Sequence, residues 1–240
     1  LIENGVVPQT GGLVEIDPKV AALRHVRTAE KRDIQVAASS SYGFGGMDTV
    51  LVFANTEKQA TANAKLPRTV VVTGISAITQ GGLFSGLEVV DAATKAGATT
   101  SVAIPETALD AEKARRLDRT SRLATVVVES ALGGGTPDAA LVLGNSFGAV
   151  DGTAEFMRRL RDKGARLVRP ADFPSLVPSS PAGYVSIYLG LRGPAFVVAD
   201  LAASGECAVA QAWEMVASGE VSRVCASAVE EKSAIIEGAF

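Results

Sequence analysis

One stretch of the sequence restricts the fold more than any other, because it sets a strand, a tight turn and a helix in succession. The apolar residues 195–199 predict a buried strand, and the small residues of 200–203 predict a sharp turn after it. A helix is expected from there to about Ser218, where Gly219 gives a stop signal. The apolar positions at helical spacing are Val209, Trp213 and Val216. Many α/β enzymes display a nucleophile at such a turn, beside the amide donors of the helix start.

Composition restricts the classes of partner. The chain has 240 residues, a net charge of −3 at pH 7 and 47% hydrophobic residues, enough for one substantial core or two small ones. Because it is not strongly basic, nucleic acid is not expected as a partner. No apolar run approaches the length of a membrane span and no signal peptide opens the chain, so we expect no membrane partner and a cytoplasmic location. Cys207, Cys225 and the single His25 lack metal-ligand spacing, which predicts no disulfide framework, no metal and no cofactor.

The N-terminal part of the chain is rich in β signals. Residues 20–27 are compatible with one short helix. Residues 33–38 and 49–53 are strand-like and flank the glycine-rich bend 39–46, a pattern that predicts an antiparallel hairpin. Residues 56–68 lose this periodicity and become polar, as linkers do.

The remainder of the chain alternates between strands and helices. A short buried strand is expected at 69–73 and a helix at 84–95. Asp118 is a candidate N-cap for a helix that runs to Leu132. Further strands are predicted at 140–143 and 223–228, and further helices at 150–163 and from Ser180. This alternation favours parallel strand pairing.

Several short motifs along the chain occur together in one known protein family. Between residues 69 and 240 they are Val70-Val-Val-Thr-Gly74, Arg116-Leu-Asp-Arg119, Gly144-Asn-Ser-Phe-Gly148, residues 173–193 and Ala203-Ser-Gly205. Through them this part resembles the first half of a β-ketoacyl-acyl carrier protein synthase (ketosynthase). Between residues 5 and 53, Gly5-Val-Val-Pro-Gln-Thr10 and Ser40-Ser-Tyr-Gly-Phe-Gly-Gly46 resemble the last part of the same family. The resemblance implies an α/β, thiolase-like layered fold of mixed sheets packed with helices, present here incompletely.

The order of the two resembling parts is inverted. Residues 1–55 resemble the C-terminal end of a ketosynthase, 56–68 are a linker, and 69–240 resemble the N-terminal half. The middle of the family, with its two histidines and its lysine, is missing, and His25 matches neither histidine. A tandem fusion of two ketosynthases cut on both sides gives this order, as does a circular permutation with a deletion. The tandem fusion is the favoured interpretation.

The resemblance also implies site residues. The family motif Thr-Ala-Cys-x-Ser-Gly falls on residues 200–205, so Ala202 occupies the position of the acylated nucleophile and cannot attack a thioester. In an alternative register Cys207 is the nucleophile, although it lies about one turn inside the helix. Phe44 corresponds to the gating phenylalanine of the family, and the amides of Phe44 and Ala202 are expected to form the oxyanion hole. A purely structural bend is the other interpretation of the segment around Phe44.

Basic residues cluster between positions 158 and 169. In the family a Lys-Gly-x-Arg turn helps to dock the acidic acyl carrier protein, and Arg166 falls on that arginine. Leu167 replaces a neighbouring position that is often basic, and a solvated helix face is the better interpretation for the arginines before Lys163.

The missing cysteine and histidines imply a function within fatty-acid or polyketide biosynthesis that does not include condensation. We expect a partner, like a chain-length factor, of an active 3-oxoacyl-acyl carrier protein synthase, with an acyltransferase fold but no activity of this chain alone. One alternative is part of an active synthase whose catalytic residues lie outside this chain, and another is a non-catalytic scaffold that binds carrier protein. The expected partners are acyl carrier protein and a ketosynthase-like subunit. The resemblance places that homo- or heterodimer contact at the strand 195–199, paired across a two-fold axis.

Overall fold

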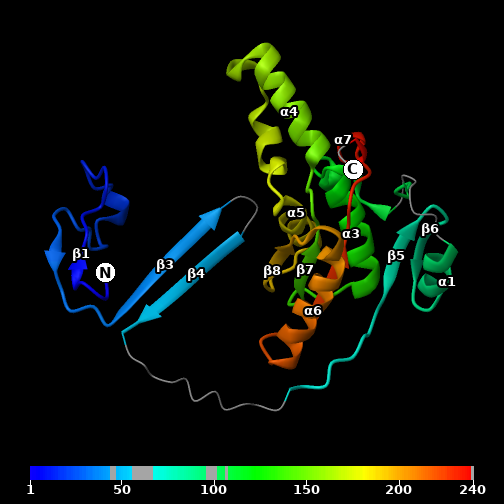
Figure 1. Ribbon diagram of the computed structural model, residues 1–240, viewed down its shortest axis with the longest axis horizontal. Helices are drawn as coiled ribbons and strands as arrows, with labels where there is room; N and C mark the ends of the chain where they lie inside the picture. Colours follow the sequence, from blue (N-terminus) through cyan, green and yellow to red (C-terminus); the bar gives the residue numbers. More distant parts are fainter. Residues whose placement is uncertain (44–46, 56–66, 96–101, 106–107, 239–240) are drawn as a thin grey trace. The chain divides into compact units, whose positions relative to one another are not determined.

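The structure is a computed structural model that describes residues 1–43, 47–55, 67–95, 102–105 and 108–238 (Figure 1). Two compact units are distinguished, one made of Leu1–Tyr42 with Asp48–Ala64 and the other of Gly43–Met47 with Lys65–Phe240. Most of the predicted linker 56–68 lies outside the described residues, as does Phe44. Among the described residues, no helix has both the length and the apolar character needed to cross a bilayer.

The first unit contains two small sheets. Strands β1 (Val6–Val7) and β2 (Glu30–Lys31) pair antiparallel. Strands β3 (Val36–Gly43) and β4 (Met47–Ala54) pair with each other and run in opposite directions (Figure 1), which confirms the predicted hairpin. The helix predicted at 20–27 is wrong, because only a 3₁₀ turn forms, at Pro18–Val20. Leu23 is 65% exposed, so no packing supports a longer helix there.

A three-stranded parallel sheet lies at the centre of the second unit. Strand β7 (Ala140–Gly144) is the middle strand, between β8 (Ala195–Val198) and β9 (Val224–Ala228). Leu141 is in register with Ala195 on one side and with Cys225 on the other. The predicted strands and their parallel pairing are therefore confirmed.

Helices cover both faces of this sheet. Helices α3 (Arg119–Leu132) and α5 (Ser180–Leu189) pack on Leu141 and Leu143 of β7. Helix α6 (Ser204–Ala217) packs on Ala140 and Val142, through Ala208, Ala212 and Met215. The alternation of β7 side chains between two apolar clusters thus forms a helix–sheet–helix arrangement.

Helix α3 begins and ends where its capping signals predict. The Asp118 carboxylate accepts the N–H of Ser121 at 2.7 Å, and Gly133 ends α3 with a φ of 67°. Helix α4 (Val150–Lys163) has the predicted bounds and extends away from the sheet (Figure 1). It is followed by 3₁₀ turns at Ala165–Leu167 and Pro170–Leu176. Two further short helices, α2 (Ala111–Ala114) and α7 (Ala234–Glu237), were not predicted.

Two predictions in this unit are wrong. Residues 69–73 form no strand, and Val71 and Val72 are 70% and 81% exposed. The strand forms later, as β5 (Ser76–Thr79) paired antiparallel with β6 (Gly82–Ser85). Because β6 takes up the first residues of the predicted helix 84–95, helix α1 is shorter and spans Glu88–Lys95.

The apolar spacing in α6 predicts the helix but not its buried face. Val209 and Trp213 are 61% and 56% exposed, whereas Ala208 and Met215 are buried. The side of α6 that faces the sheet therefore carries Ala208, Ala212 and Met215, while Val209 and Trp213 lie on another side of the helix.

Candidate functional site

The predicted turn between β8 and α6 is confirmed, and its backbone is strained. Residues Leu201–Ala203 form a single 3₁₀ turn, and α6 begins at Ser204. Among the described residues other than glycine, Leu201 alone has a positive φ, of 45°. A leucine rarely adopts this left-handed conformation, and such outliers concentrate at functional sites. The strained residue immediately precedes Ala202, the position assigned from the family motif.

Two serine hydroxyls hold this turn. The Ser204 hydroxyl lies 2.8 Å from the Leu201 carbonyl oxygen and accepts the N–H of Asp200 at 2.9 Å. The Ser146 hydroxyl lies 2.6 Å from the same carbonyl and 2.7 Å from the Ser204 hydroxyl. Each serine hydroxyl has one proton to donate, and the two hydroxyls cannot both donate to each other. At least one of them therefore donates its proton to the Leu201 carbonyl oxygen.

The loop that carries Ser146 is itself tied to the neighbouring strands. Asn145 is fully buried, and its side-chain amide donates to the Val229 carbonyl at 2.7 Å. Its backbone N–H donates to the Val198 carbonyl at 3.0 Å. The Glu230 carboxylate accepts the N–H of Ser146 at 2.8 Å. The carboxyl ends of β7, β8 and β9 are thereby joined at one edge of the sheet, where ligands bind in many α/β proteins.

Gly144 lets the start of α6 approach this edge. A Cβ atom at this position would lie 2.4 Å from the Ser204 carbonyl oxygen, so every other residue would displace the helix. The glycine at the end of β7 therefore fixes the distance between the sheet and the strained turn.

A cavity of about 620 Å³ opens at this point. Its wall contains Ala202 and Leu201 from the turn, Phe147 from the loop after β7, and Val229 and Ile236 from the segment after β9. The polar groups on the wall are Ser146, Ser204 and Glu230. The arrangement suits a ligand with an apolar chain and a small polar group at the helix start.

Neither native thiol is prepared for nucleophilic attack. The Cys207 thiol donates to the Asp200 carboxylate at 3.3 Å, and this hydrogen bond raises the pKa of the thiol, with burial and the Asp200 and Glu206 charges adding to the effect. Burial raises the pKa of Cys225 to about 11. Because the thiolate is the nucleophile, both residues favour the unreactive form at neutral pH.

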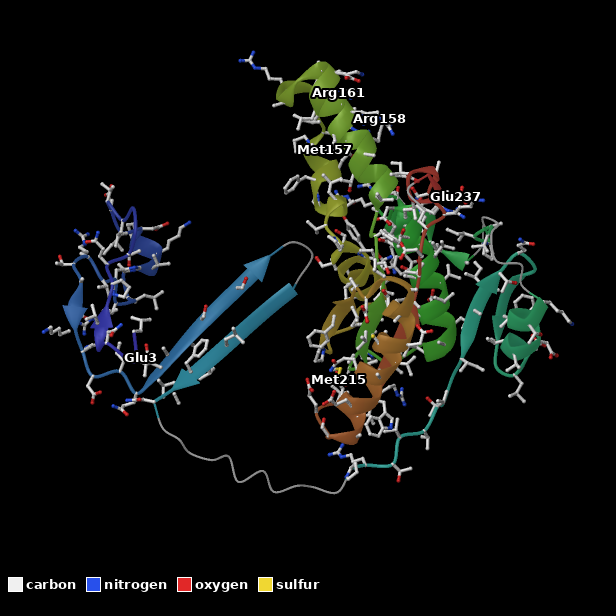
Figure 2. The ribbon with its side chains drawn as sticks, in the orientation of Figure 1. Glu3, Met157, Arg158, Arg161, Met215 and Glu237 are labelled. Carbon is white, nitrogen blue, oxygen red and sulfur yellow. The ribbon has the colours of Figure 1, made fainter. Side chains whose placement is uncertain are left out.

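The basic residues after position 157 differ in their partners. Four arginines lie within 4.0 Å of carboxylates, in the pairs Arg158–Glu155, Arg159–Glu155, Arg161–Asp162 and Arg169–Asp172. Arg158 and Arg161 project from α4 (Figure 2). Within the described part of the chain, no such ion pair involves Lys163 or Arg166, which begin and end the Lys-Gly-Ala-Arg segment 163–166. Arg166 thus lies in the 3₁₀ turn after α4, and no carboxylate of the described residues lies within 4.0 Å of its guanidinium.

The sequence did not single out Ser146, Ser204 or Glu230 as a group. The two serines lie within motifs that were recognised, but 58 positions separate them, and no spacing rule predicts that their hydroxyls meet. Across the described ranges, no cluster of His, Cys, Asp and Glu side chains has the geometry to hold a metal ion.

Comparison with known proteins finds a family match that lies within the second unit. The family described as β-ketoacyl synthase, N-terminal domain, matches residues 105–235. The 3-oxoacyl-[acyl-carrier-protein] synthase 2 of Staphylococcus aureus (strain N315) is 29% identical over 130 residues, which are 51% of this chain and 31% of that protein. Nodulation protein E of Rhizobium sp. (strain N33) is 32% identical over 124 residues, 48% of this chain and 31% of that protein. The chain thus spans about a third of the length of these curated relatives.

Solved structures extend the likeness. The ketosynthase ApeO in complex with its chain length factor ApeC from Xenorhabdus doucetiae matches with a TM-score of 0.55 and 21% identity, covering 73% of each chain. The ishigamide ketosynthase/chain length factor matches with a TM-score of 0.58 and 22% identity, covering 73% of this chain and 56% of that one. At such low identity these matches show the fold, and they confirm the predicted α/β class.

Proposed function

Because the chain belongs to the β-ketoacyl synthase family, whose N-terminal domain matches more than half of it, we propose that it is a non-condensing subunit that acts like a chain-length factor. The fold is thiolase-like, as in the ketosynthases it resembles. The observation that carries the proposal is Ala202, a methyl side chain at the cavity wall in the turn that precedes α6. Condensation requires a nucleophile that takes up the acyl group from a thioester, and a methyl group cannot do so.

What surrounds Ala202 supports a binding role. The turn, its hydroxyl bonds and the apolar cavity are all present around a position that lacks a thiol. Cys207 and Cys225 offer no replacement, since the pKa of each thiol is raised. The subunit would therefore shape or accommodate an acyl chain in fatty-acid or polyketide biosynthesis while a partner forms the new bond.

Two surfaces would meet the partners. Strand β8 is an edge of the described three-stranded sheet, and Phe196 on it is 39% exposed, so a ketosynthase-like subunit would pair along this edge. Acyl carrier protein, which is acidic, would dock at Lys163 and Arg166, whose charges have no close carboxylate among the described residues. We also propose that the chain comes from a tandem fusion, in which residues 1–55 are the C-terminal end of one ketosynthase and residues 69–240 are the N-terminal half of the next.

The first test is acylation of the unmodified chain. After incubation with a fatty acyl thioester, intact-mass measurement should show no covalent adduct, while a ketosynthase with its active-site cysteine should be acylated in parallel. An adduct that maps to Cys207 would contradict the proposal, because it would show that the register is wrong and that this chain carries its own nucleophile. Unchanged carrier-protein affinity after Arg166→Ala would remove the docking role of that residue.

A further inference from the structure

We infer that Ser146 is a positioning residue, which holds the strained turn so that position 202 stays at the cavity wall in front of α6. The inference rests on the proposed function only because it takes position 202 as the place of the reacting atom. Ser146 lies outside the turn, in the loop after β7, and fixes the geometry of the turn from there.

The first step of the argument is the strain at Leu201. Its φ of 45° is unfavourable for a branched side chain, so the conformation persists only where surrounding contacts enforce it. The Leu201 side chain is 67% exposed and gains little from packing. The enforcing contacts therefore lie at its backbone, where the carbonyl oxygen accepts hydrogen bonds.

The second step is the origin of those hydrogen bonds. The Ser204 hydroxyl and the Ser204 N–H both reach the Leu201 carbonyl, but they belong to the same local segment and move with it. The Ser146 hydroxyl reaches the same oxygen at 2.6 Å from the loop after β7. The hydrogen bond from Ser146 therefore connects the turn to the sheet, whereas those from Ser204 connect the turn only to the start of α6.

The third step is the anchoring of Ser146. Glu230 accepts its backbone N–H at 2.8 Å, and the preceding Asn145 is buried with its amide bonded to the Val229 carbonyl. Because these hydrogen bonds fix the Ser146 backbone relative to β7 and β9, its hydroxyl holds the Leu201 carbonyl at a fixed place relative to the same strands. Ser146 would lose this role on truncation to alanine, while the hydrogen bonds of its backbone would remain.

The experiment introduces a thiol at the reacting position and uses its reactivity as a measure of geometry. Ala202→Cys should be alkylated by iodoacetamide about tenfold faster than Cys207 at neutral pH, because the start of α6 stabilises a thiolate. Adding Ser146→Ala should slow alkylation at position 202 about tenfold and move the midpoint of its pH–rate profile up by about one pH unit. Asp200 in the turn, Glu206 in the first turn of α6 and Glu230 on the cavity wall oppose the thiolate, and all three carboxylates are kept in both variants.

The controls separate positioning from general damage. Ser146→Thr keeps the hydroxyl and should restore the rate and the midpoint. Ser186→Ala removes a hydroxyl that bonds to the Ala182 carbonyl at 2.8 Å within α5, and it should change neither. Alkylation of buried Cys225 in the same samples reports unfolding and should stay slow in every variant.

Two outcomes would overturn the inference. A pH–rate profile that is unchanged by Ser146→Ala means that the hydroxyl does not position the turn, and an introduced thiol no more reactive than Cys207 means that the turn does not present position 202 to the helix start. Both are distinct from failure of the proposed function, which would appear as acylation of the unmodified chain.

Discussion

Strands β7 and β4 contain equally apolar runs but differ in their surroundings. In β7 the residues 140–143 are fully buried, with an exposed fraction of 0% at each position. In β4 the residues Val50, Leu51, Val52 and Phe53 are between 52% and 67% exposed. Strand β7 has a strand on each edge and helices on both faces, whereas β4 pairs only with β3 among the described residues. An apolar run therefore predicts a strand, but the strands and helices packed around that strand decide whether its side chains are buried.

The largest expected effect tests this comparison directly. Leu143→Ala should lower the free energy of unfolding by about 2–5 kcal/mol, because it removes buried side-chain atoms and leaves a cavity between the sheet and α3 and α5. Leu51→Ala in β4 should change it by less than about 0.5 kcal/mol, since that side chain is already exposed. Urea unfolding measures both, and equal losses would mean that β4 is as well packed as β7.

The same contrast can be sharpened within one helix. Met215→Ala should cost about 2–5 kcal/mol, because Met215 is buried in the cluster that α6 forms with β7. Trp213→Ala, two positions away, should cost less, about 1 kcal/mol in the chain alone, because that side chain is 56% exposed. A large loss at Trp213, measured by the same unfolding experiment, would show that another part of the protein covers this face.

A smaller effect is expected at the end of β7. Gly144→Ala should lower stability by about 1–3 kcal/mol, because the added Cβ overlaps with the Ser204 carbonyl oxygen. Gly152→Ala in α4 should instead raise stability by about 0.5–1 kcal/mol, as its nearest contact, to the Ala149 Cβ, would be an ordinary 3.8 Å. Thermal unfolding should therefore show a lower melting temperature for Gly144→Ala and a higher one for Gly152→Ala. A neutral Gly144→Ala would place the start of α6 further from the sheet.

The smallest expected effect concerns a half-buried carboxyl group after β9. Burial raises the pKa of Glu231, and the Thr120 hydroxyl bonded to it at 3.0 Å partly offsets this, with smaller effects from Asp151, Asp118 and Arg119. The folded state therefore holds the proton more tightly than the unfolded state, and this group's contribution to stability falls as pH rises through the unfolded and then the folded pKa. Glu231→Gln should be neutral below about pH 4 and stabilising at pH 7 by less than about 1 kcal/mol.

Thr120→Val is the companion variant with the opposite sign. It removes the hydrogen bond that favours the charged carboxylate, so the loss of stability should be larger at pH 7 than at pH 4. Melting temperatures of both variants and the parent at the two pH values provide the measurement. A Glu231→Gln effect that is the same at both would show that the protonation of this group is not linked to folding.

The sequence by itself determined most elements of the second unit. Capping at Asp118 and Gly133, the apolar run of β7 and the turn of small residues before α6 are local signals, and local signals suffice where a few neighbouring residues choose the backbone conformation. The family motif also placed Ala202 in this turn. The strand predicted at 69–73 failed because an apolar run becomes a strand only where a partner strand accepts its hydrogen bonds, and Ser76–Thr79 obtained that partner instead.

Only the tertiary structure decided which groups meet at the site. Ser146 and Ser204 are 58 positions apart, and their hydroxyls come within 2.7 Å because parallel strands bring the loops after β7 and β8 to one edge of the sheet. The buried face of α6 was also decided there, because β7 packs against Ala208, Ala212 and Met215 and leaves Val209 and Trp213 exposed. Spacing along a helix or strand fixes which residues share a face, but which face is buried depends on what the rest of the chain places against it.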